Sequence, residues 1–219
     1  MQQYQLTFID LALRSNALRF GRFTLKSGRE SPYFFNAGLF SDGESAAALG
    51  RCYGAAIVAA GLGFDMLFGP AYKGIPLVTT TAIALSVDHG LKVPYAFNRK
   101  ETKEHGEGGS IIGTPLKGRV LIVDDVITAG TAVRESLGLI RAAGAQPVAV
   151  ALALDRQERG QNALSAVQEV EQTEGLRCVS IITLADLIEA LTRGPDGRAR
   201  ISDDQLTALR AYQQRYGVR

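Results

Sequence analysis

The sequence predicts an α/β fold in which a central, mainly parallel sheet is flanked by helices. Short apolar strands alternate with segments of helical periodicity along most of the 219 residues, an order typical of βαβ units. The run RVLIVD at 119–124 is continuous and β-branched, as in strands buried on both faces of a parallel sheet. Hydrophobic residues make up 46% of the chain and charged residues 21%, which excludes a disordered or fibrous protein.

The first 40 residues depart from the alternation of strands and helices. Leu6, Ile9 and Leu13 recur at helical spacing, which predicts an amphipathic core helix and not a secretory signal. Residues 20–40 alternate and turn like a short antiparallel pair of strands. We therefore expect a small subdomain over one end of the sheet.

From residue 41 onwards, turn and cap residues separate the elements. The tetrads SDGE at 41–44 and SDDQ at 202–205 each fit a capping box, so helices are expected to open there. RKETKEHGEGGS, residues 99–110, contains no apolar residue and is expected to be an exposed mobile loop. The predicted strands are 66–68, 94–98, 119–124, 148–154 and 178–182, and the predicted helices are 41–60, 76–87, 131–143, 163–171, 184–191 and one from 202.

Charge and cysteine content exclude several classes of function. The formal net charge of +2 is too small for a general nucleic-acid binder, so any anion site has to be local. Cys52 and Cys178 match no ligand spacing and the chain has two histidines, which makes a zinc site improbable and buried reduced thiols the simpler interpretation. No apolar run reaches the ~18 residues of a membrane span, and a cytoplasmic protein is expected.

The chemistry is expected at one edge of the sheet. In open α/β sheets, ligands bind outside the carboxyl ends of the strands. Loops 69–74, 99–110 and 124–131 each follow a predicted strand at that edge. In the last of them, a buried strand ends in Asp124 and Asp125, and a turn of small residues then opens a helix.

This strand–acid–turn–helix string suits a sugar phosphate. Backbone N–H groups and hydroxyls of residues 128–131 can point at one anion beside the helix N-terminus, and the two acids can accept ribose hydroxyls. One alternative is an ordinary strand–turn–helix in which the acids act as caps. Another is the acid pair of a nucleotide hydrolase, but the GxxxxGK[ST] loop that such an enzyme requires is absent from the sequence.

VDDVITAGTA, at 123–132, resembles the signature of the phosphoribosyltransferases that use 5-phosphoribosyl 1-pyrophosphate (PRPP). FTLKSGRESPYFFNAGLF, FGPAYKGIP, FNRKETKEHGEGG and LDRQERG are similar, in order and interval, to segments of the bacterial members whose acceptor base is orotate. The resemblance implies a type I phosphoribosyltransferase fold and one domain over 1–219. A hood would come from 1–40 and part of the C-terminal region, the core from about 41–190, and a lid from 99–110.

The resemblance also implies the reaction: orotate and PRPP, with Mg²⁺, give orotidine 5′-monophosphate and pyrophosphate. Mg²⁺ is expected to be held mainly through PRPP oxygens, without a dedicated protein site. Catalytic roles are implied for Lys103, His105, Asp124 and Asp125. PRPP contacts are implied for Lys26, Tyr72, Lys73, Arg99, Lys100, Lys103, His105, Asp124, Asp125, Val126, Ile127, Thr128, Ala129, Gly130, Thr131 and Ala132.

Base recognition and assembly are further implications of the same resemblance. Orotate contacts are implied for Lys26, Phe34, Phe35, Thr128 and Arg156, with the Arg156 guanidinium suited to the orotate carboxylate. The lid would reach the neighbouring subunit's site in a homodimer. Two alternatives remain: a phosphoribosyltransferase for another base, and a non-catalytic PRPP-sensing regulator that binds nucleic acid.

Overall fold

The computed structural model describes residues 1–25, 28–103, 109–128, 130–160, 163–194 and 197–218. Helices and strands alternate through the middle of the chain, as the sequence predicts. The elements are α1 (Gln3–Arg14), β1 (Leu18–Thr24), β2 (Glu30–Phe35), the 3-10 helix η1 (Ala37–Leu39), α2 (Gly43–Ala59), β3 (Met66–Gly69), α3 (Gly74–His89), β4 (Tyr95–Lys103), β5 (Gly109–Gly113), β6 (Arg119–Asp124), α4 (Thr131–Ala142), β7 (Gln146–Asp155), α5 (Ala166–Glu174), β8 (Arg177–Thr183), α6 (Leu184–Thr192) and α7 (Asp203–Tyr216).

The main sheet has six strands in the order β5-β4-β3-β6-β7-β8. Every neighbouring pair from β4 to β8 is parallel, and β5 alone in this sheet runs antiparallel, against β4. The mainly parallel sheet is therefore confirmed. Strands β3, β4, β6 and β7 all end at the same edge, which brings the segments that follow them together.

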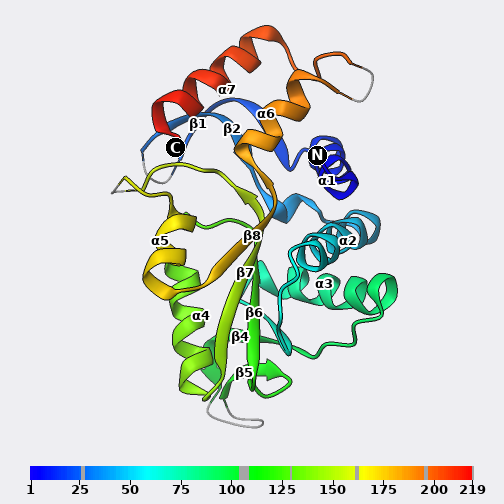
Figure 1. Ribbon diagram of the computed structural model, residues 1–219, viewed down its shortest axis with the longest axis vertical. Coiled ribbons are helices and arrows are strands. Elements are labelled where there is room, and N and C mark those ends of the chain that lie inside the picture. The colour runs from blue at the N-terminus through cyan, green and yellow to red at the C-terminus, as the bar shows by residue number, and fades with distance from the viewer. Residues whose placement is uncertain (26–27, 104–108, 129, 161–162, 195–196, 219) are drawn as a thin grey trace.

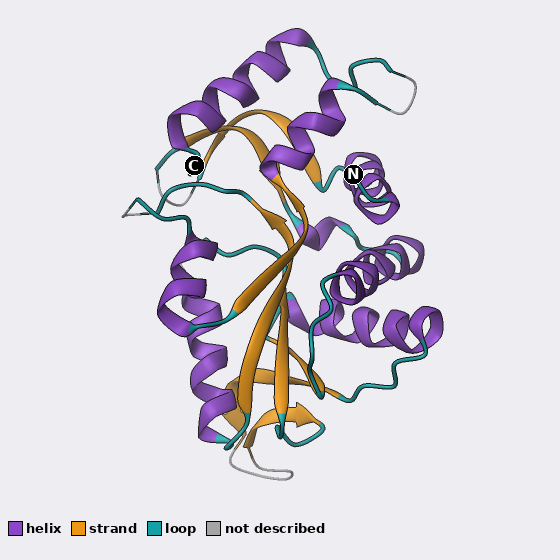
Figure 2. Ribbon diagram, in the orientation of Figure 1, coloured by secondary structure: helices purple, strands orange, loops and turns teal. Residues whose placement is uncertain are grey.

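Helices cover both faces of this sheet (Figures 1 and 2), with α2 and α3 on one face and α4 and α5 on the other. Successive side chains of a strand point to opposite faces. Along β6, Leu121 and Val123 belong to the apolar cluster on the α2–α3 side, whereas Val120 and Ile122 belong to the one on the α4–α5 side. A strand buried on both faces needs apolar residues at every position, which explains the unbroken run in the sequence.

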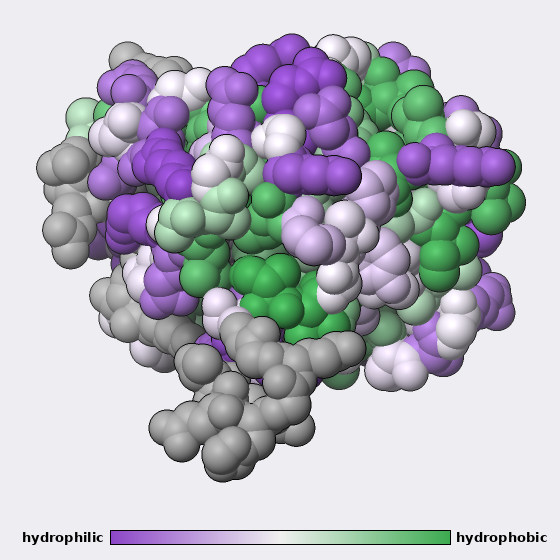
Figure 3. Space-filling model, turned by 90° about the horizontal axis from the view of Figure 1, so that it is seen from below, coloured by the Kyte–Doolittle hydropathy of each residue, from purple (hydrophilic) through white to green (hydrophobic). Residues whose placement is uncertain are grey.

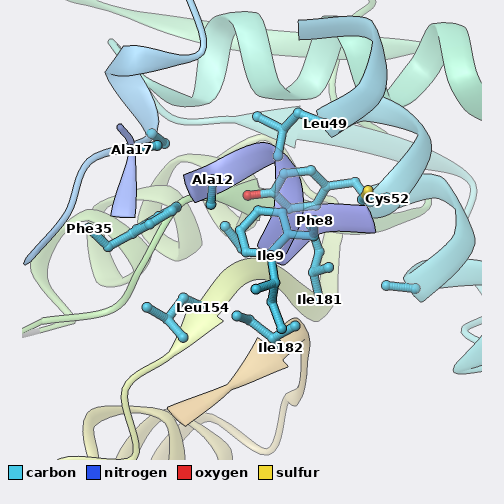
Figure 4. Close-up of a cluster of buried hydrophobic side chains, with 14 of the residues drawn as sticks. Phe8, Ile9, Ala12, Ala17, Phe35, Leu49, Cys52, Leu154, Ile181 and Ile182 are labelled. Atoms are coloured by element: carbon cyan, nitrogen blue, oxygen red, sulfur yellow. The ribbon is translucent and has the colours of Figure 1, made fainter. Parts of the chain in front are cut away.

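A second layer stands at the upper end of the molecule in Figure 1. It consists of β1, β2, α6 and α7, which we call the hood. Strands β1 and β2 pair antiparallel, as predicted for residues 20–40. Helix α1 packs between the hood and α2, and its Phe8 and Ile9 are buried beside Phe35 and Ile182 (Figure 4). Full burial of side chains this large stabilises the fold by roughly 1.5–3 kcal/mol each.

Two local expectations need correction. Asp42, and not Ser41, caps helix α2: its side chain accepts from the Ser45 N–H at 2.8 Å. Residues 99–110 do not form a loop throughout, because β4 continues to Lys103 and pairs there with Gly109, where β5 begins. Backbone pairing in a hairpin needs no apolar side chains, so the composition of the segment gave no sign of these strands.

The capping box at 202–205 is confirmed. The Ser202 hydroxyl accepts from the Gln205 N–H, and the Gln205 side chain accepts from the Ser202 N–H at 3.0 Å. Of the helices in the described part of the chain, none is long and apolar enough to cross a membrane. Seen from its lower end, the molecule shows apolar side chains in the middle of the face, with polar ones around them (Figure 3).

Candidate active site

An acid pair closes strand β6 at the edge where the parallel strands end. Asp124 is 7% exposed and Asp125 is 6% exposed. The Asp125 N–H donates to Asp124 Oδ1 at 2.8 Å, and the Val126 N–H donates to Asp125 Oδ1 at 2.9 Å. From α2, the buried Tyr53 hydroxyl donates to the Asp124 carbonyl at 2.7 Å. Hydrogen bonds from Tyr53 and from the carboxylates of the pair therefore hold the backbone of Asp124 and Asp125 in place.

Asp124 has an unusual acidity. Its pKa is raised from 3.8 to about 7, chiefly by burial and then by the nearby Asp125 carboxylate, while the Asp125 N–H and Lys73 oppose the rise. A carboxyl group with this pKa changes its charge near neutral pH. Positive charge that develops beside it favours the ionised form, so its charge can respond to a bound cation or to a cationic transition state.

Lys73 joins the loop after β3 to the loop after β6. Its Nζ lies 2.6 Å from Asp125 Oδ2, and about half of the Lys73 side chain is exposed. The Asn98 side chain, from β4, accepts from the Ala71 N–H at 2.7 Å. The Lys100 Nζ lies 5.2 Å from the centre of the exposed Tyr72 ring. Three neighbouring strands thus contribute to one cationic and acidic cluster.

Two glycines allow the loop after β3 to fold back closely on itself. A Cβ atom on Gly69 would lie 2.2 Å from the Gly74 carbonyl oxygen, and one on Gly74 would lie 2.6 Å from Pro70 Cδ. No side chain fits at such distances. The backbone turn that presents Tyr72 and Lys73 therefore depends on glycine at both ends.

The loop after β6 leads into helix α4, at the position where the sequence predicts an anion cup. Gly130 is the N-cap residue in the left-handed region, with φ of 68°, where glycine is favoured. Thr128 is exposed, and Thr131 and Ala132 lie in the first turn of α4, whose N–H groups have no partner within the helix. A Cβ on Gly130 would lie 2.8 Å from the Arg134 guanidinium, so Arg134 adds positive charge beside the cup.

Arg156 follows the end of β7 and lies toward the hood. Its side chain is 13% exposed and pairs with Glu158, with Nη2 and Oε1 2.6 Å apart. Its guanidinium carbon lies 4.4 Å from the centre of the Tyr33 ring in β2. Arg156 therefore lies at the predicted carboxyl edge of the main sheet, but its side chain contacts the hood and not the acid pair.

Phe34 and Phe35 point to opposite faces of β2. The Phe35 ring packs against Phe8 and Phe40 in the core, and the Phe34 ring stacks on Phe23 with centroids 5.5 Å apart. The two rings therefore lie on different faces of the strand, and contact of both residues with orotate stays a prediction. The backbone of β2 remains as the candidate contact.

Several predicted site residues carry no structural description. Lys26, His105 and Ala129 lie outside the described residues. Lys103 is described only as part of strand β4. Val126 is half-buried and Ile127 is buried, so they contribute to the cup through their backbone. Arg99 is half-buried in β4 next to Lys100.

The sequence did not identify four residues that organise this site: Tyr53, Asn98, Arg134 and Glu158. Arg134 carried a local signal, since it stands one helical turn after Gly130. Glu158 stood in the charged turn after β7 and was interpreted only as part of that turn. Tyr53 and Asn98 gave no local signal, because their partners lie 71 and 27 residues away in the chain.

The turn before α4, the adjacent acid pair and the facing lysine loop meet at the carboxyl edge of the parallel sheet, the arrangement expected of a phosphoribosyl-transferring class of protein. Comparison with known families agrees: the phosphoribosyl transferase domain matches residues 44–185. This match covers well over half of the chain.

Relatives that match over their full length show which family of phosphoribosyltransferases the chain resembles. The orotate phosphoribosyltransferases of Thioalkalivibrio sulfidiphilus and Cronobacter sakazakii are 60% and 57% identical over 218 residues, covering 100% of both chains. The crystal structure of the Francisella tularensis orotate phosphoribosyltransferase superposes with a TM-score of 0.84 at 37% identity, covering 96% of this chain and 98% of that one. The chain belongs to the orotate phosphoribosyltransferase family.

Proposed function

We propose that this protein transfers the 5-phosphoribosyl group from PRPP to orotate, giving orotidine 5′-monophosphate and pyrophosphate in pyrimidine nucleotide synthesis. The observation that carries the proposal is the cup formed by β6, the acid pair and α4. The full-length likeness to orotate phosphoribosyltransferases supports the choice of base over the other bases and over a regulator without catalysis.

In this proposal the cup holds the 5′-phosphate. Backbone N–H groups of residues 127, 128 and 130–132 and the Thr128 and Thr131 hydroxyls donate to its oxygens, and the N-terminus of α4 favours its negative charge. Asp124 and Asp125 accept the ribose hydroxyls. Their carboxylates then lie beside the sugar ring, where positive charge develops as the bond to pyrophosphate breaks.

Lys73 and Tyr72 bind the leaving pyrophosphate. In the structure, Asp125 neutralises Lys73 through their 2.6 Å contact. When PRPP arrives, the pyrophosphate offers more negative charge than one carboxylate, so the Lys73 ammonium turns to it and Asp125 becomes available to the ribose. Lys26, Arg99, Lys100, Lys103 and His105 complete the cationic surround.

The residues present fit a magnesium ion that arrives with its substrate. Among the described residues, no three His, Cys, Asp or Glu side chains gather as a metal cage. Two adjacent carboxylates, Asp124 and Asp125, are the oxygen donors nearest the proposed ribose position. Mg²⁺ binds readily through one or two carboxylates plus substrate phosphates, and when bound it supplies positive charge against the pyrophosphate.

Orotate recognition is assigned to Arg156, Thr128, Lys26 and the backbone of Phe34 and Phe35. A guanidinium matches a carboxylate with two parallel hydrogen bonds, and orotate differs from uracil by its carboxylate. A ring nitrogen of the bound base then attacks the anomeric carbon as pyrophosphate leaves. No side chain has to act as a nucleophile.

The working unit is proposed to be a homodimer in which the lid at 99–110 reaches the partner's site. An exposed apolar strip that runs along the C-terminal part of α3 and ends just beyond it, at Leu91, supports an interface between two copies. Ile83, Val87 and Leu91 follow one another at intervals of four residues, and they are 57%, 76% and 42% exposed. Burial of such a strip against a second copy removes apolar surface from water.

The test is the loss of orotate ultraviolet absorbance with purified protein, PRPP and Mg²⁺, with uracil, hypoxanthine and adenine as parallel substrates. Orotate-dependent turnover that stops with EDTA is the expected result. Turnover of another base in place of orotate would refute the assigned base. If no base is turned over but PRPP still binds, the result would favour the non-catalytic PRPP-sensing regulator.

The shared site has its own test. Lys103→Ala is expected to lower turnover strongly while the fold stays intact, and Arg156→Ala is expected to lower turnover through loss of the base contact. Mixed dimers of the two variants are expected to regain part of the activity, because one of the two sites then receives an intact lid and an intact Arg156. Verified heterodimers without any recovery would contradict the shared site.

A further inference from the structure

A buried network of charged and polar groups connects β2 of the hood to the turn after β7. Glu158 Oε1 accepts from both Nε and Nη2 of Arg156, at 2.8 Å and 2.6 Å. The same oxygen accepts from the Tyr33 hydroxyl at 3.3 Å, and Arg156 Nη2 donates to Ser31 Oγ at 3.3 Å. The Arg156 and Glu158 side chains are each 13% exposed. A buried ion pair of this kind is costly to break from either partner.

The turn that carries this pair is fixed independently by its backbone. Gln157 has φ of 51°, and its N–H donates to Asp155 Oδ1 at 2.8 Å. Its side-chain oxygen accepts from the Ala185 N–H at the start of α6, and its carbonyl accepts from the Val218 N–H. The Arg29 guanidinium, from the hood, donates to the Arg159 carbonyl at 2.7 Å.

A fixed turn leaves the direction of the guanidinium to its side-chain contacts. Glu158 occupies the edge formed by Nε and Nη2, and the Tyr33 ring covers one face of the guanidinium plane. Nη2 donates to Glu158 with one hydrogen and to Ser31 Oγ with the other. Nη1 is therefore the guanidinium nitrogen that Glu158 and Ser31 leave for a further carboxylate.

We propose that Glu158 is a positioning residue for recognition of the acceptor base: it orients Arg156 so that Nη1 faces the carboxylate of the base. This inference rests on the proposed orotate-binding role of Arg156. Tyr33 and Ser31 support the same orientation from β2, so the hood takes part in choosing the base through residues that do not themselves touch it. Glu158 also neutralises the arginine while no base is bound.

Glu158 could act through the position of its acceptor oxygen or through its charge, and these two explanations predict opposite effects of two mild substitutions. Glu158→Gln keeps an oxygen acceptor at the same reach but removes the charge. Glu158→Asp keeps the charge but withdraws the acceptor by one methylene group. If Glu158 acts by orienting Arg156, Glu158→Gln should preserve the KM for orotate to within about threefold. Glu158→Asp should then raise this KM by about tenfold, comparably to Glu158→Ala.

The experiment measures kcat and the separate KM values for orotate and PRPP in the full-length enzyme and each variant. The KM for PRPP should stay within about twofold of the wild type, because the phosphate cup and Lys73 lie on other loops. The matched control is Glu174→Ala, which removes a carboxylate paired with Arg141 at 3.0 Å on the α4–α5 side of the sheet. It should leave both KM values unchanged.

Three results would overturn the inference. One is an unchanged KM for orotate in Glu158→Asp and Glu158→Ala, and another is a parallel rise of both KM values, which a purely structural role would cause. The third is a larger effect of Gln than of Asp, which would assign the effect to charge. The failure of the proposed function looks different: the wild type would not consume orotate, or Arg156→Ala would leave its KM unchanged.

Discussion

Replacement of Asp124 by Asn should remove a large part of the pH dependence of stability. The carboxyl group has a pKa of about 7 in the folded chain against 3.8 for the ordinary group. A raised pKa in an acid means that the folded state still holds a proton that the unfolded state has already lost. Stability is therefore highest while Asp124 is protonated in the folded state, and it falls as the pH rises toward 7.

The magnitude follows from the two pKa values. Between about pH 5 and about pH 8, the linkage relation gives a loss of about 2 to 3 kcal/mol in the free energy of unfolding from this one group. Asn stays neutral throughout and can keep the acceptor for the Asp125 N–H, which lies 2.8 Å from Asp124 Oδ1. The variant should lack this part of the decline and should be more stable than the wild type at the higher pH.

The assay is urea unfolding of both proteins at the two pH values and at one fixed protein concentration. Asp65→Asn serves as the control, because hydrogen bonds from Arg119 lower the pKa of Asp65 to about 2. Asp65 is therefore ionised across the whole window, and its variant should decline with pH as the wild type does. If Asp124→Asn also declines by the full wild-type amount, the proton is not on Asp124 and the reasoning fails.

Three further substitutions test the surroundings of the site. Gly69→Ala should lower the free energy of unfolding by about 2 kcal/mol and weaken PRPP binding in calorimetry, because its Cβ would lie 2.2 Å from the Gly74 carbonyl oxygen; wild-type values in both would contradict the close-packed loop. Tyr53→Phe should cost about 1–3 kcal/mol in thermal unfolding, since it removes the 2.7 Å hydrogen bond to the Asp124 carbonyl, and an unchanged midpoint would show that this bond contributes nothing. Val87→Asp should shift the mass in light scattering from dimer to monomer, because Val87 is 76% exposed on the proposed interface; a stable dimer in this variant would place the interface elsewhere.

The sequence predicted those parts of the molecule in which neighbouring residues share one structural role. The run at 119–124 and the acids and glycine after it predicted a buried strand, an acid pair and a turn that opens a helix, and the structure has these in that order. The strand pair at 20–40 was predictable for the same reason, because alternation and turn residues are local signals.

Features that depend on distant contacts could not be predicted in this way. Lys73 and Asp125 are 52 residues apart, and only the parallel order of β3 and β6 brings them to 2.6 Å. Tyr33 lies 125 residues before Glu158, and the hood joins them. The strands within 99–110 were missed because an exposed hairpin is stabilised through its backbone, which leaves no pattern of apolar side chains.

The composition of the hood has a consequence for the order in which the contacts of the molecule form during folding. The hood combines β1 and β2, within residues 18–35, with α6 and α7, which lie after residue 183. The turn that carries Arg156 hydrogen-bonds to Tyr216 and Val218. Contacts between segments this far apart close long loops, whereas the contacts within each βαβ unit of the sheet are more local. We therefore expect the hood and the turn that carries Arg156 to be completed after the sheet.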